Sequence, residues 1–168
     1  MAPVIVVAGR VVDSPEQRVA DYVLGRPRTV QKFDLMAGSF EHLDKSVIDA
    51  SQVVHSRISE REARWFIERS QSAPWSLVSR TDALIDADPL LVNELYDNAE
   101  SLWRHFRVDS PIGVAEAKIA KVLHLMRPHF FPIIDSHVRK HYRGPARSAA
   151  KELLAARPAK KPISKAYW

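Results

Sequence analysis

The chain has 168 residues, 46% of them hydrophobic and 27% charged, with a formal net charge of +5. This length fits a single domain whose apolar side chains can fill a sizeable core. The sequence has no cysteine, which excludes disulfides, thiolate metal sites, iron–sulfur clusters and cysteine nucleophiles. No apolar run approaches the roughly 20 residues of a membrane span. We therefore expect a soluble, cytoplasmic protein without a membrane contact.

The positive charge is concentrated in the last third of the sequence. Residues 1–103 carry 11 Lys or Arg and 16 Asp or Glu, a net charge of −5, whereas residues 104–168 carry 14 and 4, a net charge of +10. Such a concentration is typical of a surface that faces a polyanion, where cationic side chains contact phosphates. The alternative is a solvated basic face with a loose basic tail. DNA is thus a candidate partner, while the oligomeric state is unknown.

The first forty residues contain the one strand signal. Residues 4–12 are rich in β-branched side chains, with a break at Gly9, and predict a short strand or hairpin. Residues 14–17, Ser-Pro-Glu-Gln, predict a capping box with proline at the first helical position. The helix that follows should end near Gly25 and Pro27, and we expect a loop over residues 25–38.

Three helices are predicted over the middle of the chain. The first runs over about 41–55, and a capping box at 59–62 starts the second, in which Trp65 is expected to lie in the core. Asp88-Pro89 has the same cap-then-proline pattern and should start a long helix that ends at about residue 106. Its apolar positions recur at helical spacing and predict a core stripe of Leu91, Leu95, Ala99, Leu102 and Phe106.

The basic third should contain a turn and three more helices. Residues 110–115 predict the turn, and residues 116–126 a helix that Arg127-Pro128 must end, followed by extended backbone over 128–132. Asp135-Ser136 then caps a short helix to Tyr142, and residues 148–156 form another. We therefore expect one mainly α-helical domain over residues 1–157, compact and multi-helical, with a basic tail over residues 158–168.

A candidate phosphate anchor lies where the turn meets the helix over 116–126. Backbone N–H groups near Gly113 and at the start of that helix can face a phosphate. Lys118 and Lys121 are three residues apart and share one face of the helix. The single acid Asp135 follows in a run rich in lysine, arginine and histidine. This arrangement predicts a nucleic-acid strand held beside Lys118.

Two segments, GVAEAKIAKVLHL and FFPIIDSHVRKHY, resemble the helix–hairpin–helix DNA glycosylases, the superfamily of endonuclease three and 8-oxoguanine glycosylase. The resemblance covers residues 111–142 and implies a helix–hairpin–helix element. It also implies that Lys118 is the lysine that attacks the sugar C1′ and Asp135 the aspartate that stabilises positive charge on the sugar. Such charge develops when an N-glycosidic bond breaks, and a carboxylate stabilises it. The sequence departs from the family at Ala115, which replaces a hairpin glycine.

From this resemblance and the charge pattern we predict two catalytic and six DNA-binding residues. The catalytic residues are Asp135 and Lys118, and the DNA-binding residues are Gly113, Lys121, Arg127, His137, Arg139 and Lys140. The alternatives are that Asp135 only caps its helix and that Lys118 is a solvated helix residue. His137 and His141 are four residues apart and with Asp135 could form a metal site, but such isolated pairs are weak signals. We expect neither a metal nor another cofactor.

The whole chain is also similar to an uncharacterised family common in actinobacteria. The segments that carry this similarity are residues 55–59, residues 73–75 and the block KVLHLMRPHFFPIIDSHV. It implies no activity, but it suggests that residues 10–145 fold as one unit. Three hypotheses for the function follow: a base-excision DNA glycosylase, a DNA-binding module without chemistry, and a surface for an acidic protein partner.

Overall fold

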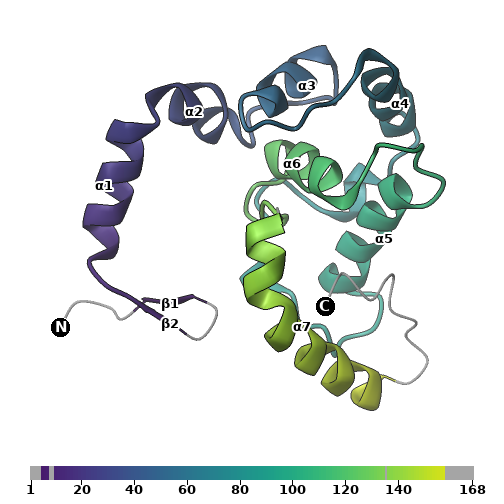
Figure 1. Cartoon of the computed structure of the whole chain (residues 1–168). Helices are drawn as coiled ribbons and strands as arrows, with labels where there is room; N and C mark the ends of the chain where they lie inside the picture. The colour runs from purple at the N-terminus through teal and green to yellow at the C-terminus, as the bar shows by residue number, and fades with distance from the viewer. Residues whose placement is uncertain (1–4, 8–9, 135, 158–168) are drawn as a thin grey trace.

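Helices dominate the architecture, as the sequence predicts (Figure 1). The computed structural model describes residues 5–7, 10–134 and 136–157. The elements in chain order are β1 (Ile5–Val7), β2 (Arg10–Val12), α1 (Pro15–Gly25), α2 (Pro27–Lys32), η1 (Asp34–Met36), α3 (Lys45–Gln52), α4 (Glu60–Ser70), η2 (Trp75–Leu77), η3 (Leu84–Asp86), α5 (Leu95–Arg107), α6 (Glu116–Met126) and α7 (Ser136–Ala156). None of the helices within these ranges is long and apolar enough to cross a membrane. The predicted basic tail, residues 158–168, lies outside the described residues.

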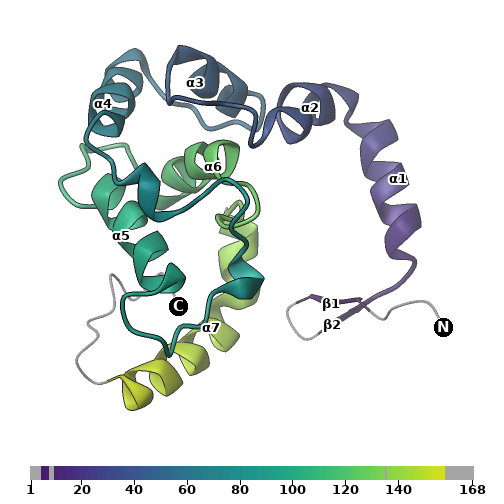
Figure 2. The same cartoon turned by 180° about the vertical axis from the view of Figure 1, so that it is seen from behind.

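The N-terminal elements form an arm that extends away from the other helices, as the two opposite views in Figures 1 and 2 show. The predicted hairpin is confirmed, with β1 antiparallel to β2. Pro15 opens α1, but the capping box is not formed, because Ser14 has a left-handed backbone (φ 49°) and its side chain makes no capping bond. The loop expected over 25–38 contains α2 and η1, because Pro27 starts a new helix.

The core is formed around α6. On this helix Ile119, Ala120, Val122, Leu123 and Leu125 are all fully buried, so α6 is enclosed over most of its circumference rather than along one stripe. The helices α3 and α5 pack directly against it, α4 packs against both of these, and the segment that precedes α3 contributes to the same core. Their fully buried side chains include Phe33, Val47, Phe66, Leu102 and Phe106.

Capping side chains determine where α3 and α4 begin. The carboxylate of Asp44 accepts hydrogen bonds from the N–H groups of Ser46 and Val47, so α3 starts at Lys45 and not near residue 41 as predicted. The second capping box is confirmed: Ser59 accepts from the N–H of Glu62, and the Glu62 carboxylate accepts from the N–H of Ser59 at 2.6 Å. Both arrangements satisfy N–H groups that a helix start leaves without a partner.

The long helix predicted from residue 89 starts six residues later, as α5 at Leu95. Asp88 caps only a turn, in which its carboxylate accepts from the N–H of Leu90 at 2.8 Å. Asn93 then takes a left-handed conformation (φ 61°) that interrupts any continuous helix. Consequently Leu91 is exposed and does not belong to the predicted core stripe. The other four residues of that stripe do face the core: Leu95, Ala99, Leu102 and Phe106.

The last two helices differ in how well the sequence predicts them. α6 and its end at Arg127-Pro128 are confirmed, but residues 128–132 are not extended. Both Phe130 and Phe131 donate their N–H groups to the carbonyl of Arg127, which makes a turn that buries the two rings. The two helices predicted over 136–142 and 148–156 are one helix, α7, with Pro145 inside it. Because Pro145 is on the exposed side and Leu153 is buried, tertiary packing favours continuation of the helix.

Candidate nucleic-acid interface

The turn between α5 and α6 is a helical hairpin with a left-handed residue at each end. Asp109 has φ 59° and Gly113 has φ 100°. Within it the N–H of Val114 donates to the carbonyl of Pro111 at 3.0 Å, and the buried Val114 side chain anchors the turn. A Cβ atom on Gly113 would lie 2.5 Å from Oε1 of Glu62. Glycine is therefore required here by its backbone angle and by the close approach of a carboxylate.

Lys118, the predicted nucleophile, forms an ion pair with that carboxylate. Its Nζ lies 2.6 Å from Oε1 of Glu62, and the two side chains are 18% and 8% exposed. Burial alone would raise the pKa of Glu62, but hydrogen bonds from Lys118 and from the backbone and side chain of Ser59 outweigh burial, so this pKa is lowered. The lysine thus links α6 to the start of α4, and its ammonium is held by a buried partner.

Two further predicted phosphate contacts, Lys121 and Arg127, are bound to backbone carbonyls. Lys121 Nζ donates to the carbonyl of Val54 at 2.7 Å, just beyond the end of α3. Arg127 is 7% exposed, and its guanidinium donates to the carbonyls of Val78, Met126 and Trp75. It also lies 5.2 Å from the ring centroid of Trp75. Burial lowers the pKa of Arg127. This side chain holds the end of α6 to the segment around η2.

The start of α7 is joined to the start of α6. Nη1 of Arg139 lies 3.0 Å from one carboxylate oxygen of Glu116, and Nε of Arg107 lies 3.9 Å from the other. Glu116 and Lys118 are two residues apart, which places their side chains about 200° apart around the helix. Arg139 and Lys118 are therefore on different sides of α6. The hairpin and α7 come together, whereas Lys118 faces α4.

The predictions for Asp135 and His137 have no structural test. Asp135 lies outside the described residues, and so does the side chain of His137. Within the described part of the chain no group of three His, Asp or Glu side chains could hold a metal ion. The alternatives for Asp135, a helix cap and a catalytic carboxylate, therefore both stay predictions.

The exposed face of α7 carries a row of cations. Lys140, Arg143, Arg147 and Lys151 are three or four residues apart, so they lie along one side of the helix, and all four are exposed. No ion pair between described residues involves any of them. We refer to these four residues as the α7 basic stripe. Only Lys140 was among the predicted DNA-binding residues.

A comparison with protein families identifies the family to which most of the chain is similar. The sequence profile of DUF6308, a family of unknown function, matches residues 16–160. The chain belongs to the DUF6308 family. This agrees with the predicted similarity to an uncharacterised family and adds no support for the resemblance to DNA glycosylases, which stays a prediction. Comparison with curated proteins and with solved structures gives no match.

The fold of this DUF6308 member thus places seven of the basic side chains of the last third in two groups. Lys118, Lys121 and Arg127 are directed inward to a carboxylate or to carbonyls, whereas the α7 basic stripe faces solvent. The sequence prediction missed Glu62 as a partner of Lys118, because 56 residues separate them. It also missed Arg143, Arg147 and Lys151, although their spacing of four residues was a visible signal for a shared helix face.

Proposed function

We propose that this protein binds DNA along the α7 basic stripe. The observation that carries the proposal is the stripe itself: four exposed cations on one side of a 21-residue helix, with no acidic partner among the described residues. Cationic side chains without partners can neutralise phosphates and release their counterions, which is the main source of affinity for DNA. Residues 136–156 contain five Lys or Arg and one Glu, a net charge of +4.

The dimensions of the stripe suit a phosphate backbone. Lys140 and Lys151 are eleven residues apart, which corresponds to about 16 Å along a helix. Duplex DNA carries one negative charge per roughly 1.7 Å of its axis, so a stripe of this length faces several phosphates. The side chains Arg143 and Arg147 lie in the middle of the stripe and are the two whose loss should weaken binding most.

The experiment that tests this proposal compares two variants with the same net charge. In one, Arg143→Gln and Arg147→Gln remove the centre of the stripe. In the other, Arg61→Gln and Arg64→Gln remove two exposed cations from α4, which lies away from α7 in both views (Figures 1 and 2). Glutamine and arginine have similar helix propensities, so both variants should fold.

Titration of a labelled duplex at about 50 mM salt should show at least a tenfold loss of affinity in the α7 variant and little change in the α4 variant. Equal losses in both would mean that only net charge attracts DNA and would refute a defined site on α7. If the wild type does not bind DNA at all and instead binds an acidic protein in the presence of excess DNA, the result would support an acidic protein, rather than DNA, as the partner of the stripe.

Base excision is a second candidate, favoured by one observation, the helical hairpin with its left-handed Gly113 directly before α6. The resemblance assigns the carboxylate to Asp135. Release of a free base from a damaged duplex, abolished in Asp135→Asn with DNA affinity retained, would establish this activity. Because Lys118 is paired with Glu62, we do not expect borohydride to trap a Lys118 adduct on an abasic duplex. A trapped adduct that disappears in Lys118→Gln would contradict that expectation.

A further inference from the structure

An acidic and apolar segment, which begins with η3 and ends just before α5, lies exposed. Five of its aliphatic side chains are exposed: Leu84, Ile85, Leu90, Leu91 and Val92. Ile85, at 93% exposed, and Val92, at 63%, are the most accessible of them. We refer to residues 84–94 as the 84–94 segment. Five exposed aliphatic side chains within eleven residues concentrate apolar surface on one short segment, and exposed apolar surface of this kind favours an interaction.

Charge gives this segment a preferred partner. Asp86, Asp88 and Glu94 are exposed, and no ion pair between described residues involves them. The sequence has no Lys or Arg between residues 81 and 103. A segment that presents aliphatic and acidic side chains together fits a partner that presents apolar and basic ones together.

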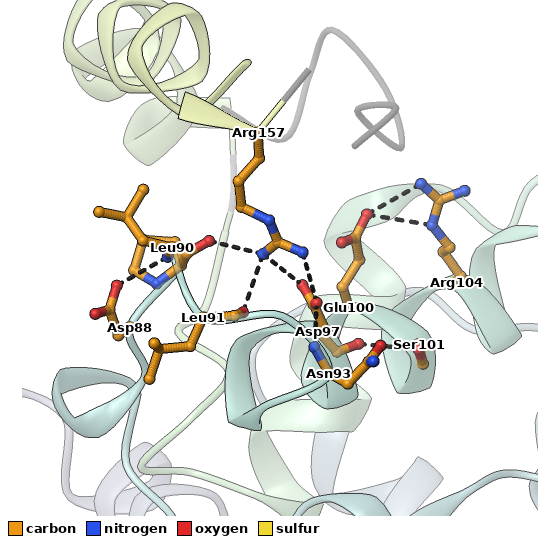
Figure 3. A network of polar contacts seen from close by, with 10 residues as sticks. Asp88, Leu90, Leu91, Asn93, Asp97, Glu100, Ser101, Arg104 and Arg157 are labelled. Carbon is orange, nitrogen blue, oxygen red and sulfur yellow. Dashed lines mark hydrogen bonds and ion pairs between the residues drawn. The ribbon is translucent and has the colours of Figure 1, made fainter. Parts of the chain in front are cut away.

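The end of α7 is fixed to this segment by Arg157 (Figure 3). Nη1 of Arg157 donates to the carbonyl of Pro89 at 2.8 Å and to that of Leu91 at 3.1 Å. Nη2 lies 2.8 Å from the carboxylate of Asp97, and both of these side chains are largely buried. The chain therefore leaves the described structure at the 84–94 segment.

We propose that residues 158–168 bind the 84–94 segment of the same chain. These eleven residues, PAKKPISKAYW, carry three lysines and no acid, together with Ile163, Tyr167 and Trp168. Residues 158–168 thus combine basic side chains, which complement the acidic ones of the 84–94 segment, with apolar side chains, which can cover its aliphatic ones. Eleven residues can extend over roughly 35 Å, and the anchor at Arg157 already contacts Pro89 and Leu91, so the segment is within reach.

Two physical effects favour the binding of residues 158–168 to the 84–94 segment of the same chain. Aromatic side chains that cover exposed aliphatic ones remove apolar area from water. Attachment at Arg157 also makes the contact intramolecular, so the local concentration of the basic residues is in the millimolar range. The docking does not depend on DNA binding, since it involves the opposite end of α7 from Lys140 and different side chains.

Disulfide trapping in the full chain tests the proposal, because the sequence has no cysteine of its own. The test variant carries Val92→Cys and Lys165→Cys. The control variant carries Gln71→Cys and Lys165→Cys, with the first cysteine directly after α4, a helix that lies away from the end of α7 in both views (Figures 1 and 2). Both variants are oxidised mildly at low protein concentration, and the products are separated by size under non-reducing conditions.

We expect the test variant to form a disulfide within the monomer at least tenfold faster than the control. Adding Asp86→Lys and Glu94→Lys to the test variant should slow that reaction severalfold at low salt. Equal rates in test and control variants would overturn the proposal. A disulfide that forms only between two chains would also overturn it, and would make residues 158–168 of a second copy the occupant of the segment.

Discussion

Replacement of Lys118 by methionine tests whether the lysine is held in a structural ion pair. Lys118→Met keeps the apolar stem of the side chain and removes its charge. The carboxylate of Glu62, 8% exposed, then keeps its hydrogen bond from the N–H of Ser59 but loses its cation. Removal of one partner from a buried pair costs about 3–5 kcal/mol. Because Lys118 is 18% exposed, some water can reach the site, and we expect a loss of about 2–3 kcal/mol.

Urea unfolding measures this loss directly. With a denaturant slope of about 2 kcal/mol per molar urea, the midpoint should fall by roughly 1–1.5 M. Lys45→Met is the matched control, since it breaks an ion pair with Asp49 whose side chains are 70% and 60% exposed, and should change the midpoint very little. Adding Glu62→Gln to Lys118→Met removes the unpaired charge, so we expect the double variant to regain part of the loss.

The pH dependence supplies an independent test of the same pair. The pKa of Glu62 is lowered in the folded protein, so its contribution to stability is complete above its ordinary pKa of about 4.3 and is lost as pH falls through the lower folded value. In Lys118→Met the carboxyl takes up a proton more readily, which removes the buried charge. The difference in stability between wild type and Lys118→Met should therefore be large at pH 7 and smaller near pH 4. If the urea midpoint of Lys118→Met at pH 7 equals that of the wild type, the ion pair with Glu62 does not stabilise the fold and the structural role of Lys118 is refuted.

Three other outcomes follow from the same contacts. In thermal unfolding Gly113→Ala should cost more than about 2 kcal/mol, because the new Cβ would meet Glu62 and the backbone angle is unfavourable for alanine. The control is Gly144→Ala inside α7, where a Cβ meets nothing within 4 Å, so this change should be neutral or stabilising by up to about 1 kcal/mol. Arg127→Met should lower the urea midpoint by more than Arg64→Met does, because it leaves the carbonyl of Val78 without its donor; equal midpoints would contradict this. Burial lowers the pKa of His124, so its contribution is complete above about pH 6.5 and lost as pH falls; the stability loss between pH 7 and 5 should be smaller in His124→Gln than in wild type.

Local signals predicted those elements whose boundaries depend on neighbouring residues. The capping box at Ser59 and the stop at Arg127-Pro128 are both settled within four residues of the helix end, and α4 and α6 were predicted well for that reason. The predicted start of α5 is wrong because Asp88-Pro89 has the sequence of a helix start but forms only a turn. The left-handed Asn93 lies between this turn and the helix.

The site depended on contacts that no local pattern contains. Lys118 was singled out by its place in the hairpin, but the pairing with Glu62 joins two helices 56 residues apart. The sequence predicted two helices, over 136–142 and 148–156, where the structure has the single helix α7 with Pro145 inside it, and this division concealed the basic stripe. The helix continues because residues on both sides of Pro145 contact the body: Arg139 reaches Glu116, and Leu153 is buried.

The salt dependence of DNA binding tests the central claim most directly. Four phosphate contacts predict a slope of about −3.6 for the logarithm of the association constant against the logarithm of salt concentration, which is a loss of roughly 100-fold between 50 and 200 mM. Removal of Arg143 and Arg147 together should bring this slope to about −1.8, whereas removal of Arg61 and Arg64 should leave it unchanged. A slope that is the same in the wild type and the α7 variant would contradict binding along α7.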